Sequence, residues 1–315
     1  MSQNLIGDKI RNSQNIDKLM DQLMSEWMES TSSIKGIRPP QVEAIESGKA
    51  WVDKVGQKRG RPLYYPYVGT GAGRGAYVEL EDGSVKMDLI NGIGIHLMGH
   101  GHPDVVKASV RGALCDIVVQ GNLQPNREYF QFSEKLVELA SRKSRLKYAW
   151  LATCGTMANE SALKITRQKH SPARKVLAFK DAFAGRSTMM AEVTDNPAYK
   201  VGLPSYDEIL RLPFYDKKNG GTGGHEKTLN AMKEHWDKNP HNISTFVFEP
   251  MLGEGGYKRA PREFFVPLLE FCKEKKIAVW ADEIQTFTRT GEIFAFETLG
   301  IGEYIDLCTI AKTAQ

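Results

Sequence analysis

The second half of the chain alternates apolar segments with amphipathic ones, and this alternation limits the possible folds more than any other feature. Apolar runs with the length of buried strands are Lys147–Thr153, Arg174–Lys180, Glu208–Phe214, Ile243–Phe248, Ile277–Asp282 and a run that begins at Ile305. Segments with helical spacing lie between several of them: Gly155–His170, Glu226–Lys238 and Arg262–Lys275. Such alternation predicts βαβ units, and therefore an α/β fold with a mainly parallel sheet and helices on both faces.

The first part of the chain is organised differently. Apolar residues recur at helical spacing between Ser13 and Trp27, which predicts an amphipathic helix. The following stretch, 30–66, is polar and contains several prolines, so it is interpreted as connecting structure with one short helix. From Ala76 to Ile90, two strand-like runs flank a tight turn, which predicts a β-hairpin.

The glycine-rich stretch 69–75 formally matches a dinucleotide-binding pattern through Gly71, Gly73 and Ala76. That pattern binds a dinucleotide when it follows a strand and opens a helix, whereas here a hairpin follows. The glycines are better explained by the bend that leads into the hairpin. A nicotinamide-dependent dehydrogenase is therefore the weakest of the alternatives considered.

Composition argues against nucleic-acid and membrane partners. The 315 residues carry a formal net charge of +4, with the basic residues scattered along the chain. Apolar runs do not reach membrane-spanning length, and the N-terminus lacks the apolar core of a signal peptide. The four cysteines are far apart and form no CxxC pair, which is typical of reduced thiols and predicts a cytoplasmic protein.

His100, His102 and Asp104 imitate a cluster of metal ligands. Pro103, however, fits the first turn of a helix predicted over Asp104–Leu114, which explains the local sequence without a metal. Because short motifs often match by chance, no metal site is predicted.

The ends of the predicted strands carry chemically reactive side chains. The last two strands finish near Asp282 and Lys312, thirty positions apart, and an earlier strand is followed by Glu249 and, after a short turn, Glu254. In an open α/β sheet, ligands bind outside the carboxyl ends of the strands. Gly155 lies between a strand and a helix, so free N–H groups at the helix start predict an anion site, most naturally for a phosphate.

A phosphate site, a buried acid and an amine together indicate a particular cofactor chemistry. A desolvated lysine loses part of its affinity for protons and can form a Schiff base with an aldehyde. Pyridoxal phosphate is an aldehyde with a phosphate and a pyridine nitrogen, and a neighbouring carboxylate keeps that nitrogen protonated. In this hypothesis Lys312 supplies the amine and Asp282 the carboxylate.

Several ordered motifs closely resemble those of the class III, ornithine- and 4-aminobutyrate-type, aminotransferases. The motifs are Leu97–Pro103, Gly155–Asn159, Phe183–Arg186, Glu249–Pro250 with Gly253–Gly256, and Asp282–Thr286 with Arg289–Gly291. The resemblance covers roughly Gly69 to Lys312. It implies the aspartate-aminotransferase fold (pyridoxal-phosphate fold type I) and a homodimer with active sites at the subunit interface.

The resemblance also implies a role for each matching residue. Lys312 corresponds to the Schiff-base lysine that moves protons, Asp282 to the partner of the pyridine nitrogen, and Gln285 to a donor to the ring hydroxyl. Gly155 and Thr156 correspond to the phosphate cradle, and Phe183 to the aromatic that stacks on the ring. Glu249 corresponds to the acid that orients the glutamine, and Glu254 to the substrate-gate acid.

The domain division follows from the same resemblance. Residues 1–95 are expected to form an N-terminal helix, a connecting segment and a hairpin that belong to a small domain, and residues 96–315 a large domain that binds pyridoxal phosphate. The sequence ends at Gln315, three residues after the lysine, so the C-terminal small domain of the family is expected to be absent from it. Local departures from the family pattern, at Ala184, Met251-Leu252 and Phe287-Thr288, alter the walls of the pocket and leave the substrate open.

The leading functional hypothesis is an aminotransferase that moves the terminal amino group of an ω-amino acid to 2-oxoglutarate. The candidate donors are ornithine, acetylornithine, lysine and 4-aminobutyrate. An aminomutase or decarboxylase that uses the same cofactor is one alternative. A truncated, non-catalytic relative is another, because of the position at which the sequence ends.

Overall fold

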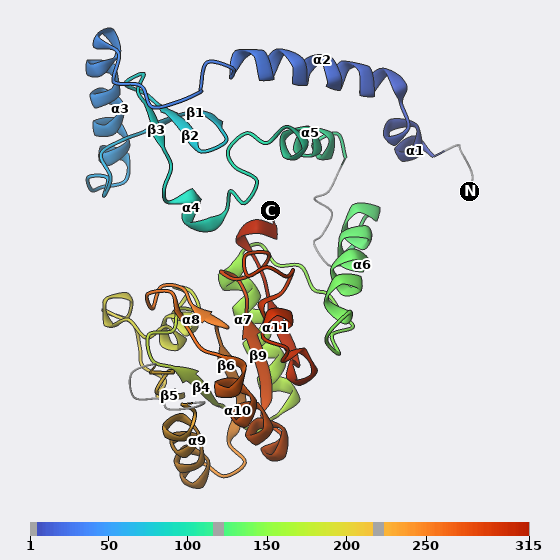
Figure 1. The fold of residues 1–315 in the computed structure, drawn as a ribbon, viewed down its shortest axis with the longest axis vertical. Helices are drawn as coiled ribbons and strands as arrows, with labels where there is room; N and C mark the ends of the chain where they lie inside the picture. Colours follow the sequence, from blue (N-terminus) through green and yellow to red (C-terminus); the bar gives the residue numbers. More distant parts are fainter. Residues whose placement is uncertain (1–4, 116–122, 217–223, 315) are drawn as a thin grey trace. The chain divides into compact units, whose positions relative to one another are not determined.

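The computed structural model describes residues 5–115, 123–216 and 224–314, and the chain divides into two compact units, Met1–Gly121 and Asn122–Gln315 (Figure 1). Each unit is described by itself. The assignment of residues 1–95 to a small domain and 96–315 to a cofactor-binding domain stays a prediction.

The first unit combines helices with a small antiparallel sheet. Its helices are α1 (Ile6–Arg11), α2 (Gln14–Ser30), η1 (Val42–Ala44), α3 (Ile45–Lys58), α4 (Asn91–Gly94) and α5 (Pro103–Gly112). Its strands, β1 (Gly69–Arg74), β2 (Tyr77–Leu80) and β3 (Val85–Met87), pair in the order β1-β2-β3. The Ser13 side chain caps α2 by accepting a hydrogen bond from the Ile16 N–H, and the predicted amphipathic helix is confirmed.

One prediction for this unit is wrong in detail: the connecting stretch contains a helix, α3, of 14 residues rather than a short one. The glycine-rich stretch forms the strand β1, and the chain bends after it at Gly75, whose φ is +59°. A Cβ at Gly73 would lie 2.8 Å from the Cβ of His100, so glycine permits the close packing at this point. The His100 ring pairs with Asp88 at 2.7 Å.

The second unit contains the predicted parallel sheet. Its strands are β4 (Lys175–Phe179), β5 (Ile209–Leu212), β6 (Ile243–Phe248), β9 (Ala278–Asp282) and β10 (Leu307–Thr309). They lie in the order β10-β9-β6-β4-β5, and every neighbouring pair is parallel. A separate two-stranded ribbon pairs β7 (Met251–Leu252) with β8 (Lys258–Arg259).

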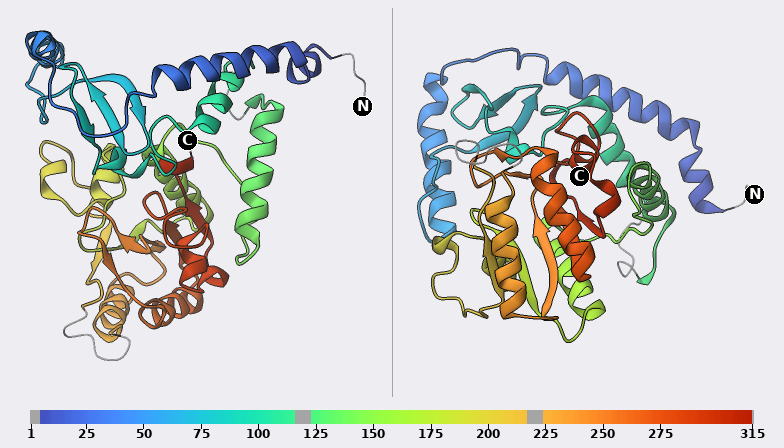
Figure 2. Two further views of the ribbon diagram at one scale, coloured as in Figure 1. Left: turned by 45° about the horizontal axis from the view of Figure 1, so that its top comes forward. Right: turned by 60° about the horizontal axis from the view of Figure 1, so that its bottom comes forward.

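Helices cover this sheet on both faces (Figure 2). The longer helices of this unit are α6 (Arg127–Ser141), α7 (Gly155–Lys169), α9 (Glu226–Lys238) and α10 (Arg262–Lys275), of which α7, α9 and α10 contact the strands. The shorter ones are α8 (Thr188–Val193), η3 (Pro197–Tyr199), α11 (Ala295–Thr298), η4 (Gly302–Tyr304) and η5 (Lys312–Ala314). The bounds of α9 and α10 agree with the sequence prediction.

Alternate residues of each strand enter two separate cores, as the twofold period of a strand requires. In β4, Leu177 and Phe179 belong to the larger core with α9 and α10, whereas Val176 and Ala178 belong to the smaller core with α7 and α8. All four residues are fully buried. Burial on both faces explains why these strands are continuous apolar runs in the sequence.

The segment Lys147–Thr153, predicted as a strand, is irregular in the structure. Its large aromatic side chains are exposed, Tyr148 at 95% and Trp150 at 63%. The apolar pattern suits a strand, but a strand also needs a neighbour for its backbone hydrogen bonds. β10 is the last of the described strands at this side of the sheet, and its outer edge is the possible neighbour, but Lys147–Thr153 forms no strand paired with it.

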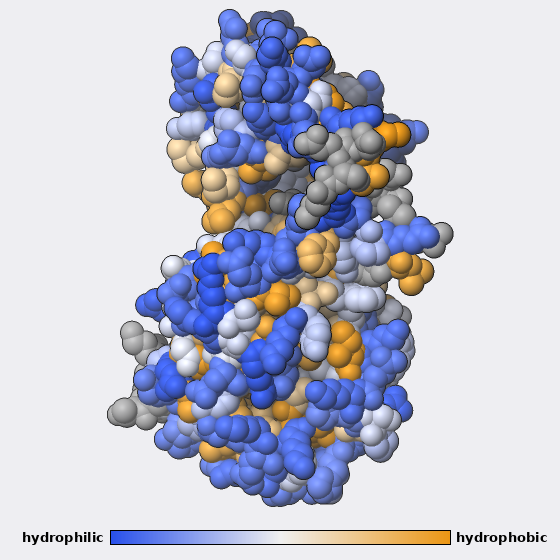
Figure 3. Space-filling model, turned by 90° about the vertical axis from the view of Figure 1, so that its right-hand side faces the viewer, coloured by the Kyte–Doolittle hydropathy of each residue, from blue (hydrophilic) through white to orange (hydrophobic). Residues whose placement is uncertain are grey.

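The face of the molecule in Figure 3 is mostly hydrophilic, with apolar side chains scattered among charged ones. Among the described helices, none is both long enough and apolar enough to cross a membrane.

A buried hydrogen bond between two strands provides a test of this packing. The indole Nε1 of Trp280 donates to Thr309 Oγ1 at 3.0 Å, and both residues are buried. We predict that Trp280→Phe and Thr309→Val each lower the free energy of unfolding by about 1–3 kcal/mol, because each leaves a buried polar group without its partner. The double variant should lose less than the sum, because neither polar group then remains. Urea unfolding of the four proteins measures this coupling, and strict additivity would contradict it.

Candidate active site

The carboxyl ends of three neighbouring strands bring together the residues predicted from the sequence. Glu249 directly follows β6, Asp282 is the last residue of β9, and Lys312 lies three positions after β10. Because these strands are parallel and adjacent, their carboxyl ends lie at one edge of the sheet.

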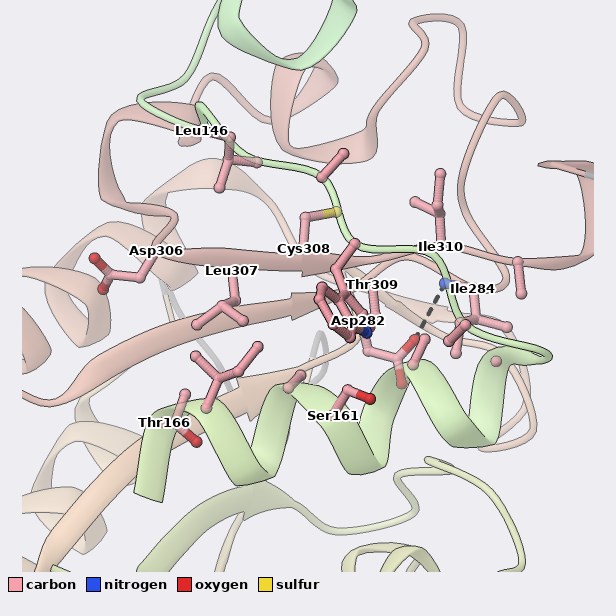
Figure 4. Close-up of a pocket in the computed structure, with 18 of the residues that line it drawn as sticks. Leu146, Ser161, Thr166, Asp282, Ile284, Asp306, Leu307, Cys308, Thr309 and Ile310 are labelled. Atoms are coloured by element: carbon pink, nitrogen blue, oxygen red, sulfur yellow. Dashed lines mark hydrogen bonds between the residues drawn. The ribbon is translucent and has the colours of Figure 1, made fainter. Parts of the chain in front are cut away.

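A cavity of about 1390 Å³ opens at this edge and continues along the outer side of β10 (Figure 4). The predicted site residues that line it are Gly155, Thr156, Phe183, Glu249, Asp282, Gln285 and Lys312. At the opposite end of the strands, its lining includes His170 and Lys276. The cavity is larger than a typical small-molecule pocket of roughly 300–1,000 Å³ because it follows the whole strand as well as the strand ends.

Asp282 is a buried carboxylate held by two donors. Its Oδ2 accepts from Asn159 Nδ2 at 2.7 Å, and its Oδ1 accepts from the Ile284 N–H at 3.1 Å. Figure 4 shows Asp282 beside α7, with the bond from Ile284 as a dashed line. Burial raises the pKa of Asp282 to about 6, although both hydrogen bonds and Lys312 act in the opposite direction. The site therefore favours a cation next to this carboxylate.

Glu249 is a second buried acid at the same edge. Its Oε1 accepts from the Phe183 N–H at 2.9 Å, and its Oε2 accepts from the Gly253 N–H at 3.0 Å. Burial, and then the charge of Asp282, raise the pKa of Glu249 to about 8. The carboxyl group thus joins the loop that carries Phe183 to the turn that carries Glu254.

Lys312 occupies an unusual backbone conformation where the chain leaves β10. Its φ angle is +51°, in the left-handed region that residues with a side chain rarely adopt and that is found preferentially at functional sites. Partial burial, and then the charge of Arg289, lower the pKa of its amine, whereas Glu254, Asp282 and Glu249 act in the opposite direction. A lowered pKa leaves more of the amine in the neutral, nucleophilic form.

The N-terminus of α7 faces the same cavity and has free N–H groups. Its N-cap residue, Cys154, makes no side-chain capping bond, and Gly155 and Thr156 line the cavity. A Cβ at Gly155 would lie 2.8 Å from Ile284 Cδ1 and 3.2 Å from Ala311 Cβ, so glycine allows helix and loops to approach closely here. The helix is 15 residues long, so its dipole adds to the attraction for an anion.

The other predicted residues lie around this centre. Phe183 and Gln285 line the cavity, and the Phe183 ring meets Tyr199 edge-on, with ring centroids 6.0 Å apart. Glu254 is exposed and is not among the lining residues, although its charge acts on Lys312. The turn of Glu254 reaches Gln285: a Cβ at Gly253 would lie 2.7 Å from the Gln285 side-chain carbon Cδ.

The structure adds residues to which the sequence assigned no role. Asn159 follows Gly155 by one helical turn, and this spacing could have indicated that it faces the same site. Its Oδ1 is buried and has no hydrogen-bond partner among the described residues. Arg289 approaches Lys312 from a loop, and Glu283 is completely buried although it is charged and next to Asp282. A charged residue at a strand end gives no sequence signal that it is buried.

Comparison with protein-family models shows the family to which this chain belongs. Residues 62–314 match the family model described as aminotransferase class-III. The chain belongs to the class-III aminotransferase family. The resemblance inferred from the sequence motifs is therefore confirmed, and members of this family depend on pyridoxal phosphate.

Curated relatives of this aminotransferase-family chain carry several transaminase names. It is 33% identical to a probable 4-aminobutyrate aminotransferase of Bacillus subtilis over 76% of this chain and 57% of the relative. It is 34% identical to a 2-aminoadipate transaminase of Pseudomonas putida over 76% of this chain and 58% of the relative. It is 32% identical to the acetylornithine aminotransferase of Bacillus subtilis over 76% of this chain and 57% of the relative. The chain thus spans less than two thirds of the length of these relatives.

Solved structures confirm the fold. An (S)-enantioselective ω-transaminase from Thermomicrobium roseum superposes with a TM-score of 0.75 at 23% identity, covering 84% of this chain and 62% of that one. The lysine aminotransferase of Mycobacterium tuberculosis in its internal aldimine form superposes with a TM-score of 0.70 at 22% identity, covering 84% and 66%. The predicted fold, an aspartate-aminotransferase-like α/β fold with a mainly parallel sheet, is confirmed.

The residues at the strand ends fit pyridoxal phosphate. The uncapped α7 N-terminus suits its phosphate, and the half-buried Lys312 amine suits its aldehyde. The negative charge of ionised Asp282 is buried and is not fully stabilised by its hydrogen bonds, as the raised pKa of this group indicates. The carboxylate therefore suits a protonated pyridine nitrogen. The three groups line one cavity, as a single bound molecule requires.

The raised pKa of Glu249 leads to a prediction about stability. A carboxyl group whose pKa rises from its ordinary value of 4.5 to about 8 on folding binds more protons in the folded chain than in the unfolded one. The free energy of unfolding should therefore fall as the pH rises between these two values, by at most about 1.4 kcal/mol for each pH unit. Glu249→Gln resembles the protonated form, so we predict a smaller fall between pH 5 and pH 8.

Urea unfolding of the cofactor-free chain at pH 5, 6, 7 and 8 measures this effect. The control is Glu263→Gln, which makes the same chemical change at an exposed position of α10. This control should keep the pH dependence of the unsubstituted chain. Equal pH dependence of Glu249→Gln and the control would contradict the prediction.

Proposed function

We propose that this chain is part of a pyridoxal-phosphate-dependent aminotransferase that moves the terminal amino group of an ω-amino acid to 2-oxoglutarate. The observation that carries the proposal is the position of Lys312, Asp282 and the α7 N-terminus around one cavity at the carboxyl ends of the strands. The proposed donors are ornithine, acetylornithine, lysine and 4-aminobutyrate. The names of the curated relatives support this substrate class.

When bound, pyridoxal phosphate supplies an aldehyde that condenses with amines and a ring that withdraws electrons from the substrate Cα. Each proposed role belongs to a residue whose surroundings suit it. Lys312 would hold the aldehyde and, once displaced by the substrate amine, take a proton from the substrate carbon and return it. Its lowered pKa keeps part of the amine free to accept that proton.

Asp282 would keep the pyridine nitrogen protonated, since an ionised carboxylate stabilises an adjacent cation. Asn159 and the Ile284 N–H hold this carboxylate in one orientation. The N–H groups of Gly155 and Thr156 would bind the phosphate, and Phe183 would stack on the ring. Gln285 would donate to the ring hydroxyl.

The structure supports a broader role for Glu249 than the orientation of Gln285 alone. Its carboxyl oxygens accept from the backbone of Phe183 and of Gly253. We infer that it fixes the stacking aromatic and the Glu254 turn at once, which also places Gln285 through the close contact with Gly253. Glu254, exposed beside Lys312, remains the proposed substrate-gate acid.

Covalent capture of the cofactor tests the attachment site. After incubation with pyridoxal phosphate and reduction with borohydride, peptide mapping should find the cofactor on Lys312, and Lys312→Ala should abolish this label. Lys276 lines the opposite end of the same cavity, so Lys276→Ala is the matched control and should keep the label on Lys312. A label on another lysine, or on none, would refute the assignment.

Dependence on an acceptor tests the reaction type. An aminotransferase consumes its amino donor beyond one equivalent only when a 2-oxo acid is present, because the cofactor must return the amino group. We predict that turnover of the candidate donors requires added 2-oxoglutarate. Sustained turnover without any acceptor would indicate an aminomutase or a decarboxylase instead, and product analysis by mass spectrometry separates these outcomes.

A further inference from the structure

Two consecutive acids at the end of β9 point to opposite sides of the sheet. Residues two positions apart in a strand lie on the same face. Asp282 therefore lies on the face of Trp280, which belongs to the core beside α7. Glu283 lies on the face of Ala281, which belongs to the core with Phe294 and Phe296. The Glu283 N–H still donates to the Thr309 carbonyl at 2.8 Å, so its backbone remains attached to β10. The Glu283 side chain therefore cannot share the site of Asp282.

Glu283 is fully buried, and both oxygens of its carboxylate accept hydrogen bonds. Oε2 accepts from the Ala295 N–H at 2.7 Å and from Thr286 Oγ1 at 3.2 Å, and Oε1 accepts from the Phe296 N–H at 2.9 Å. Burying a charge is costly, so a carboxylate at such a position must be compensated by several donors. Burial nevertheless raises the pKa of Glu283 to about 7.

These bonds close a loop. Residues 284–294 leave the sheet directly after Glu283 and return at Ala295, whose N–H binds the Glu283 side chain. The Glu283 carbonyl also accepts from the Phe287 N–H at 2.9 Å. One residue thus holds the start and the end of the segment 284–294, which we call the closing loop.

The closing loop contacts the turn that contains Lys312. Thr288 Oγ1 donates to Thr313 Oγ1 at 3.1 Å, and Thr313 Oγ1 donates to the Phe287 carbonyl at 3.1 Å. Arg289, bound to the Gln285 carbonyl at 2.7 Å, acts electrostatically on the Lys312 amine. The position of the closing loop therefore determines how close this positive charge lies to the lysine.

We propose that Glu283 is a positioning residue for Lys312: its carboxylate anchors the closing loop and thereby sets the distance of Arg289 and Gln285 from the lysine amine. Glu283 itself does not line the cavity. The proposed consequence for catalysis depends on the proposed function, whereas the effect on the lysine can be measured without a cofactor.

The direction of the effect distinguishes positioning from simple electrostatics. The charges that act on Lys312 are those of Arg289, Glu254, Asp282 and Glu249. Arg289 lowers the pKa of the amine, so a loop that moves away should raise it. Glu283 is not among these charges, so loss of its charge without movement of the loop should not raise the pKa of Lys312.

The test uses Glu283→Gln in the cofactor-free chain. Glutamine keeps the shape, but its amide nitrogen cannot accept a hydrogen bond from Ala295 or Phe296. The Lys312 pKa comes from the pH dependence of its acetylation rate, followed by peptide mass spectrometry. We expect it to rise by about half a unit, which corresponds to a roughly threefold slower reaction at pH 8. Amide hydrogen exchange in the peptide that contains Ala295 and Phe296 should become about tenfold faster.

The matched control is Glu292→Gln. Glu292 lies in the same closing loop, but its side chain is exposed and pairs with Lys143 at 3.2 Å. This variant should leave the Lys312 pKa and the exchange rate unchanged. The proposal is overturned if Glu283→Gln gives the same Lys312 pKa as this control, or a lower one.

A second variant covers the case in which Glu283→Gln does not fold. Glu283→Asp retains the charge, but its shorter side chain cannot reach both N–H groups, so a smaller rise of the Lys312 pKa is expected. If Glu283→Gln shows no cooperative unfolding, the aspartate variant decides, and an unchanged Lys312 pKa refutes the proposal. Failure of the proposed function would appear separately, as missing cofactor on Lys312 after borohydride reduction.

Discussion

Parallel pairing of β6, β9 and β10 is the constraint on which the site depends. Their register places Phe248 beside Ala281 and Asp282 beside Thr309, so the residues that follow each strand emerge at one edge. β6 and β9 are short and buried along their whole length, and β10 has three residues, of which Thr309 is buried. A shift in register would move buried apolar side chains to the wrong face of the sheet. A slip by one residue would exchange the faces of Asp282 and Glu283 and would separate the acid from Lys312.

Burial determines the acid-base properties of the carboxyl groups at this edge of the sheet. Asp282 and Glu249 are only 3% and 4% exposed, so neither can rely on water to stabilise its charge. Buried carboxyl groups keep their charge only when donors or cations compensate for lost hydration. Asp282 has two donors, and Glu249 has two backbone N–H groups. These donors do not fully replace the lost hydration of the Asp282 carboxylate, which explains why a cationic ring nitrogen suits the position beside it.

The loops that complete the site are held by the same kind of interaction. Glu249 connects the Phe183 loop to the Gly253 turn, and Glu283 connects both ends of the closing loop. In each case a buried carboxylate binds two backbone N–H groups: those of Phe183 and Gly253 for Glu249, and those of the consecutive residues Ala295 and Phe296 for Glu283. Such bonds fix loops that secondary structure alone would leave free. The family relationship places these acids in a known class of enzymes, but their contacts come from this chain's own geometry.

The sequence by itself determined the sheet, most of its helices and the residues at its edge, because apolar periodicity and glycine turns are local signals. It also indicated Lys312, Asp282 and the α7 N-terminus correctly as neighbours, since parallel strands end at one edge. Tertiary structure decided the rest. Whether Lys147–Thr153 forms a strand depends on a neighbour to pair with, and no local pattern specifies that neighbour. The strand period alone places Asp282 and Glu283 on opposite faces, but which face holds the cavity, and which N–H groups each acid binds, follow from long-range packing.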